Sequence, residues 1–137
     1  MEEKSILTVI CALLNTWEGR PADFLPETEG AVPGAVVTAL SGTHQIKRYI
    51  DGSYMGQFPF AVSLYTDGVS PGEKLLVLGK LDMLSHWLTD HLPPADSSRV
   101  YTRIRCTVLP AKASVWDDGT EEYRASFVLE YNAAPKN

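Results

Sequence analysis

The chain has 137 residues, 45% hydrophobic and 21% charged, which is typical of one globular domain and excludes a disordered chain. Seventeen acidic residues against twelve Lys and Arg give a net charge of -5, which argues against a domain whose main task is to neutralise a nucleic-acid backbone. No apolar run approaches the roughly 20 residues of a membrane span, and the acidic start is unlike a signal peptide. We therefore expect a single domain, residues 1–137, folded in a reducing cytoplasm with Cys11 and Cys106 as buried, reduced thiols and with no membrane partner.

The first predicted element is a helix over residues 3–18. Its apolar residues recur at spacings of four, three and four, the period of one helical face: Ile6, Ile10, Leu13 and Trp17. Proline and glycine then recur through residues 20–34, which we expect to form a long irregular loop.

Three strands are predicted next, over residues 35–40, 45–50 and 57–66. The third strand alternates well, and one of its faces is apolar: Phe58, Phe60, Val62 and Leu64. Pro59 cannot donate a backbone hydrogen bond, so we expect the start of this strand at a sheet edge or outside the pairing.

A second helix is predicted to begin at Ser70 and Pro71, where Ser suits the cap and Pro suits the first helical position. Its apolar period extends to Leu92, before two consecutive prolines end it. Gly79 lies inside this period, so we expect it to kink the helix or to divide it into two pieces.

The last third alternates as a long hairpin, with strands over residues 100–108 and 123–132 and a turn at 117–119. Residues 133–137 are expected to form a flexible tail. The predicted order is α-β-β-β-α-β-β, and strands with one apolar face are typical of an antiparallel sheet covered on one side. The predicted class is α+β, in two layers, with a mainly antiparallel sheet covered on one face by two helices.

Candidate catalytic and metal-binding residues are few. His86 and His91 are five residues apart, a spacing that turns them away from each other on a helix, and neighbouring Ser85 and His86 point in different directions. Asp82 and Asp90 are interpreted as residues of a solvated helix face. We expect no enzymatic activity, no metal site and no cofactor.

Two basic residues, Arg103 and Arg105, alternate out of the last sheet region. They could pair across strands with an acid such as Glu122 or Glu130, or they could form a basic stripe that faces a partner.

The segment from Lys47 to Phe58 is the strongest candidate for an interface. It places Tyr49, Tyr54 and Met55 in or beside a turn, and aromatic residues, Met and Arg are enriched at protein interfaces. Simple packing onto the sheet edge is the alternative. The candidate interface residues are Lys47, Arg48, Tyr49, Asp51, Tyr54, Met55, Phe58, Arg103 and Arg105.

The same segment carries a resemblance to a known family. Residues 47–53, read Lys-Arg-Tyr-Ile-Asp-Gly-Ser, and residues 57–61, read Gln-Phe-Pro-Phe-Ala, resemble a pattern of minor capsid proteins from tailed bacteriophages, which are similar to tail terminators. Residues 84–88, ending in Trp-Leu, and the closing hairpin from residue 117 to Leu129 resemble two further blocks of that family in the same order. Ser53 departs from the pattern, which more often has a second glycine there, and residues 68–79 do not match it.

This resemblance implies a structural role in a virion. Tail terminators are small α+β proteins that assemble as a hexameric ring on the last ring of the tail tube and present a surface to the neck or head connector. The implied partners are further copies of the chain, the tail tube protein and a neck or head-connector protein, and a contractile sheath is compatible with this role. The implied location is the tail–neck junction, after assembly in the cytoplasm of the host bacterium. The acidic balance suggests a lumen through which DNA passes without specific binding.

Two alternatives stay open at this point. The chain could be another phage part, such as a head–tail joining or head completion protein. It could also be a small cytosolic ligand-binding α+β domain or enzyme, for which a pocket lined by His44, Tyr49 and Tyr65 is the simplest expectation.

Overall fold

The computed structural model describes residues 6–19, 24–26, 35–40, 45–66, 71–95, 98–117 and 119–134. The described elements are two helices and six strands, and they confirm the predicted α+β class. They are α1 (Ile6–Leu14), β1 (Phe24–Pro26), β2 (Ala35–Ala39), β3 (Gln45–Arg48), β4 (Tyr54–Thr66), α2 (Pro71–Thr89), β5 (Arg99–Val115) and β6 (Glu121–Ala133).

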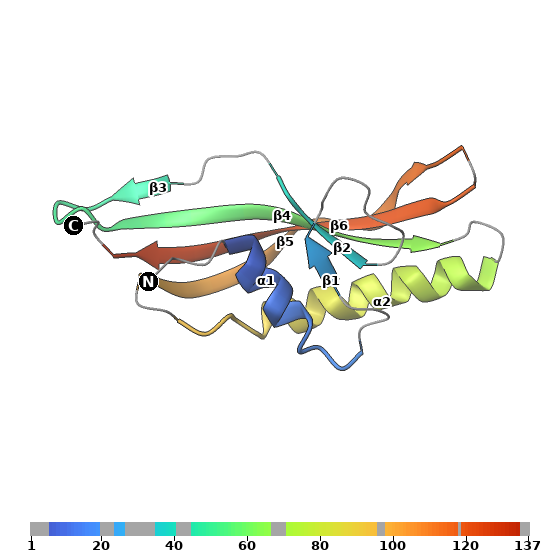
Figure 1. The fold of residues 1–137 in the computed structure, drawn as a ribbon, viewed down its shortest axis with the longest axis horizontal. Coiled ribbons are helices and arrows are strands. Elements are labelled where there is room, and N and C mark those ends of the chain that lie inside the picture. Colours follow the sequence, from blue (N-terminus) through green and yellow to red (C-terminus); the bar gives the residue numbers. More distant parts are fainter. Residues whose placement is uncertain are drawn as a thin grey trace.

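The strands form one sheet in the order β1-β2-β4-β6-β5, and β3 pairs with β4 at the end that β2 does not reach (Figure 1). All pairs are antiparallel except β1 with β2. The central pair, β4 with β6, runs without a register shift from Tyr54 opposite Ala133 to Thr66 opposite Glu121. These two strands form the long axis of the molecule.

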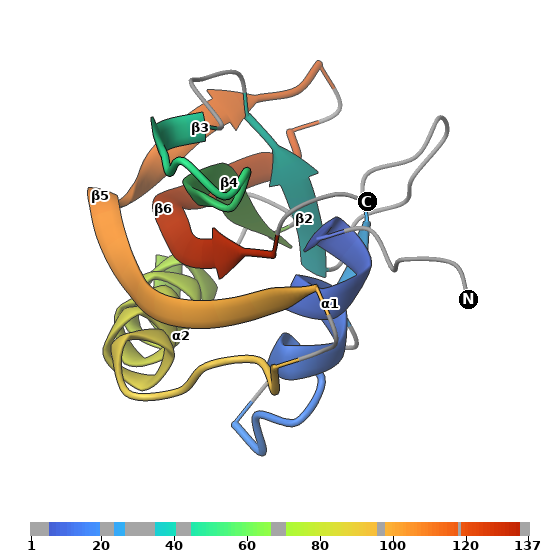
Figure 2. The same ribbon diagram turned by 90° about the vertical axis from the view of Figure 1, so that its left-hand side faces the viewer.

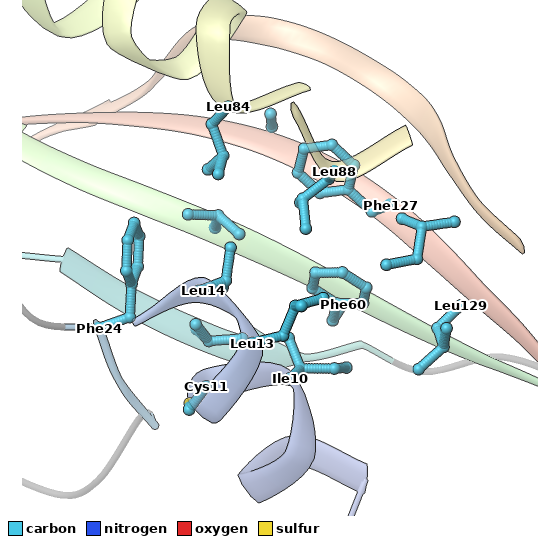
Figure 3. Close-up of a cluster of buried hydrophobic side chains, with 14 of the residues drawn as sticks. Ile10, Cys11, Leu13, Leu14, Phe24, Phe60, Leu84, Leu88, Phe127 and Leu129 are labelled. Carbon is cyan, nitrogen blue, oxygen red and sulfur yellow. The ribbon is translucent and has the colours of Figure 1, made fainter. Parts of the chain in front are cut away.

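Both helices pack on the same face of the sheet, as predicted. Figure 2, which looks along the strands, shows a curved sheet with α2 beside β5 and α1 beside β2, and α1 also contacts β1. The core lies between the helices and the sheet (Figure 3), where the rings of Phe60 and Phe127 stack with centroids 5.4 Å apart. Around them the helices contribute fully buried aliphatic side chains: Ile10, Leu14, Leu81, Leu84 and Leu88.

The predicted irregular loop over residues 20–34 contains a strand that sequence reasoning missed. The amide of Phe24 donates to the Asn15 side-chain oxygen at 2.7 Å, and the Asn15 side-chain nitrogen donates to the Phe24 carbonyl at 3.1 Å. This exchange fixes β1 to the end of α1, and the Phe24 side chain is buried. The rest of the predicted loop lies outside the described residues.

Pro59 lies inside the central strand β4, so the expectation of an edge position is wrong. It stands opposite Val128 of β6, and its carbonyl accepts from the amide of Leu40, just past the end of β2. A strand residue directs its N–H and C=O to the same side, so the missing N–H of Pro59 faces the point where β2 has ended. The proline therefore removes no bond from the ladder between β4 and β6.

Helix α2 continues through Gly79 from Pro71 to Thr89, so the predicted division into two pieces does not occur. Gly79 is exposed, and nothing lies within 4 Å of the place where its Cβ would be. The predicted cap, Ser70, lies outside the described residues. At the other terminus, Ala133 belongs to β6 and is buried, and residues 135–137 lie outside the described residues.

Candidate subunit interface

The turn between β3 and β4 is built by short-range hydrogen bonds. The amide of Tyr49 donates to the Ser53 carbonyl at 2.8 Å, and Gly52 adopts a φ of 90°, which favours glycine. The Asp51 carboxylate accepts from the amide of Ser53 at 2.9 Å and from its hydroxyl at 2.6 Å. These bonds hold the pKa of Asp51 below its ordinary value. Asp51 therefore shapes the turn.

This turn presents a row of exposed side chains, which we call the tip (residues 46–53). Ile50 has a relative exposure of 108%, so the fold gives its side chain no cover. Lys47 Nζ lies 5.4 Å from the centroid of the Tyr49 ring, within cation–π range. Ile46 and Arg48 are exposed beside them. A turn that only reverses the chain would not need the exposed apolar side chains of Ile46, Tyr49 and Ile50. Their presence favours a contact with a partner.

Three of the predicted interface residues, Tyr54, Met55 and Phe58, belong to β4 rather than to the tip. All three are half-buried. The Tyr54 ring meets Tyr131 edge-to-face with centroids 6.2 Å apart, and Phe58 packs against the core. Burial and the neighbouring Tyr54 raise the pKa of Tyr131 to about 12. Packing onto the sheet thus accounts for a large share of these contacts.

Arg103 and Arg105 pair with an acid, as one of the two sequence interpretations stated. Their Nε atoms lie 2.7 and 3.7 Å from Glu130 Oε2, and their side chains remain 62% and 47% exposed. Strands β4 and β6 lie between β5 and β3, so these arginines are not part of the tip. The structure therefore does not bring the nine candidate residues into one patch.

Sequence reasoning missed a second exposed region, at the opposite end of the molecule. We call it the hairpin end (residues 109–117 and 119–124), where the chain passes from β5 to β6 (Figure 1). Leu109 is 75% exposed, and Val115 and Trp116 are also exposed next to the acidic turn. The centroid of the Trp116 ring lies 5.3 Å from that of the Tyr65 ring, so the two aromatic side chains pack against each other. The signal available in the sequence was an apolar pair, Val115-Trp116, placed directly before a polar turn.

A buried polar network supports the hairpin end on the sheet face opposite the helices. Glu122 accepts from the hydroxyls of Ser63 and Ser114 at 2.7 and 2.9 Å and from Arg124 Nη2 at 2.8 Å. Burial alone would raise the pKa of Glu122, but these hydrogen bonds and the Arg124 charge bring it below its ordinary value. We expected a mostly polar, open face here, whereas Ser63 and Glu122 are buried. Their mutual hydrogen bond compensates for the loss of contact with water.

The described residues offer no assembled catalytic or metal-binding group. No cluster of three or more His, Cys, Asp and Glu that could hold a metal occurs among them. Ser85 is buried and donates to the Leu81 carbonyl, and His86 is exposed 3.8 Å from Asp82. One alternative expected a pocket lined by His44, Tyr49 and Tyr65. Tyr49 lies in the tip before β4 begins and Tyr65 lies near the other end of β4, so the structure does not bring these two residues together. His44 lies outside the described residues.

Both cysteines are free. Cys11 is buried as predicted, and burial raises its pKa to about 11. Cys106 is half-buried on β5, and burial raises its pKa as well. No described helix is long and apolar enough to cross a membrane.

Comparisons with known proteins add no relationship, because no protein-family model matches the chain and no curated protein matches it.

Proposed function

We propose that this chain is a structural subunit of a tailed bacteriophage, similar to a tail terminator, that forms a ring on the tail tube and joins it to the neck or head connector. Its mechanism is geometric and uses no chemical step. Identical subunits that contact one another through two different surfaces close into a ring when the rotation per subunit allows it.

The observation that carries this proposal is the position of the segment that resembles the phage family. Its polar and aromatic part, residues 47–53, forms the exposed tip, and its apolar part enters the sheet, where Phe60 is fully buried. One stretch of sequence thus supplies both a core strand and a surface that has no partner within the described fold. This division favours a subunit that completes its contacts in an assembly.

The two other blocks of resemblance lie in the core and at the hairpin end. Leu84 and Leu88 of α2 are fully buried, and the third block, from residue 117 to Leu129, includes most of β6 with Phe127 and Leu129 in the core. The resemblance therefore follows the framework of the fold as well as its exposed ends. In the proposed ring, the net charge of -5 would disfavour retention of DNA in the lumen.

The proposal is tested by removing the protein from phage assembly. Without it, we expect tails of uncontrolled length that do not join heads, and purified protein added to tail tubes should cap one end in negative-stain images. Tails of normal length joined to heads in its absence would contradict the proposal. Normal tails beside unfinished heads would instead support a head completion role.

A further inference from the structure

The two exposed ends of the subunit differ in charge as well as in position. The tip carries Lys47 and Arg48 against Asp51. At the hairpin end the buried Glu121 and Glu122 pair with Lys112 and Arg124, and the acidic Asp117 is exposed. Both ends also expose apolar side chains, with Ile50 on the tip and Leu109 on the hairpin end among the most exposed in the molecule. The charges of the two ends are therefore complementary, and both ends expose apolar side chains that a contact between them would cover.

The sheet holds these ends far apart. Arg48 of β3 pairs with Tyr54, the first residue of β4, and Thr66, the last residue of β4, pairs with Glu121. Thirteen residues of extended strand span about 40 Å, so one subunit cannot join its own two ends. Figure 1 shows the two ends at opposite extremes of the long axis.

We infer that the tip of one subunit docks on the hairpin end of a second copy of this chain, in a head-to-tail contact. This inference rests on the proposed ring and names the two surfaces that would form it. A contact between two tips would bring two basic surfaces together, and like charges across an interface are repulsive. A contact between unlike ends pairs the basic tip with Asp117 and covers Ile50 at the same time.

Because each subunit has one tip and one hairpin end, the contact repeats from copy to copy, and the product is a closed ring or a filament rather than a dimer.

The first experiment is directional cross-linking on protein bound to tail tubes, because a subunit can remain monomeric until it meets a tube. Ile50→Cys and Val115→Cys are made in a Cys106→Ser background, and Cys11 is buried. A short bismaleimide should give dimers in an equal mixture of the two variants and none with either variant alone. Self-cross-linking of one variant, or no cross-link in the mixture, would overturn the inference.

The second experiment exchanges the charges of the two ends. One variant carries Lys47→Glu and Arg48→Glu, and the other carries Asp117→Lys and Asp118→Lys. Each variant alone should self-associate at least about tenfold more weakly than the parent protein. An equal mixture of the two variants should recover the parent's association, because the acidic tip of one attracts the basic hairpin end of the other. A variant with Asp82→Lys, at an exposed position of α2, and Asp90→Lys, at the exposed residue just after α2, is the matched control and should assemble normally.

These outcomes separate the inference from the proposed function. If the unmodified protein caps tubes but the charge exchange has no effect, the inference is wrong and the proposed function stands. If the mixture cross-links in concentrated solution but the protein never binds a tube, the contact stands and the proposed function fails.

Discussion

Tyr131 lies so close to the backbone of Gly56 that a Cβ on Gly56 would be 2.5 Å from Tyr131 Cζ. The glycine belongs to β4 and the tyrosine to the facing position of β6. This close approach explains why a residue without a side chain stands at the third position of the long strand β4.

Gly56→Ala should therefore destabilise the protein by about 1–3 kcal/mol, because the ring and the strand must move to admit the methyl group. Gly79→Ala is the control, since nothing lies near its Cβ and alanine favours a helix by about 0.5–1 kcal/mol. Urea unfolding would measure both changes. Equal stabilities for Gly56→Ala and the parent protein would show that the ring moves freely.

Glu122→Gln should lower the free energy of unfolding by about 1–2 kcal/mol at pH 7, because the amide cannot replace the charge facing Arg124. The pKa of Glu122 lies below its ordinary value in the folded state, so its stabilisation is present above pH 4.5 and is lost as pH falls further. The stability difference between variant and parent should shrink in that range. Asp82→Asn, at an exposed carboxylate, should stay within about 0.5 kcal/mol of the parent at every pH.

Asn15→Ala should release β1 from the end of α1. It removes both hydrogen bonds to Phe24 and leaves that buried amide and carbonyl without this partner, at a cost of about 1–3 kcal/mol. Hydrogen exchange at Phe24 should accelerate strongly, while amides of β4 and β6 should change only with global stability. Unchanged protection of Phe24 would show that pairing with β2 alone holds the strand.

Replacing Tyr49 and Ile50 with Ser should leave the monomer as stable as the parent, within about 0.5 kcal/mol, because both side chains are exposed. The same variant should fail to form rings on tail tubes. Replacing Tyr54 and Met55 instead should lower stability, because these residues are half-buried on the sheet. Normal assembly by the first variant would remove the tip from the interface.

The sequence predicted those parts of the fold that depend on local periodicity. Alternation in β4 placed Phe60, Val62 and Leu64 on the core face correctly, and the structure buries all three. Gly79 shows the limit of local rules, since an exposed glycine inside a long helix costs about 1 kcal/mol and does not break it.

Features that depend on distant residues were not predictable. β1 is three residues long and exists through Asn15 and a parallel partner, neither of which leaves a periodic signal. The pairing of Glu122 with Ser63 joins positions 59 residues apart, and no local pattern in the sequence indicates it. The tip could be singled out in the sequence because its aromatic and basic residues are concentrated in a few positions.

The unbroken pairing of β4 with β6 gives the subunit a fixed length between its two ends. Thirteen consecutive residue pairs without a bulge fix the distance and the twist between the tip and the hairpin end. In a head-to-tail assembly, that distance and twist determine how many copies complete one turn. A single bulge introduced into this ladder would therefore change the diameter of the ring while both docking surfaces stayed intact.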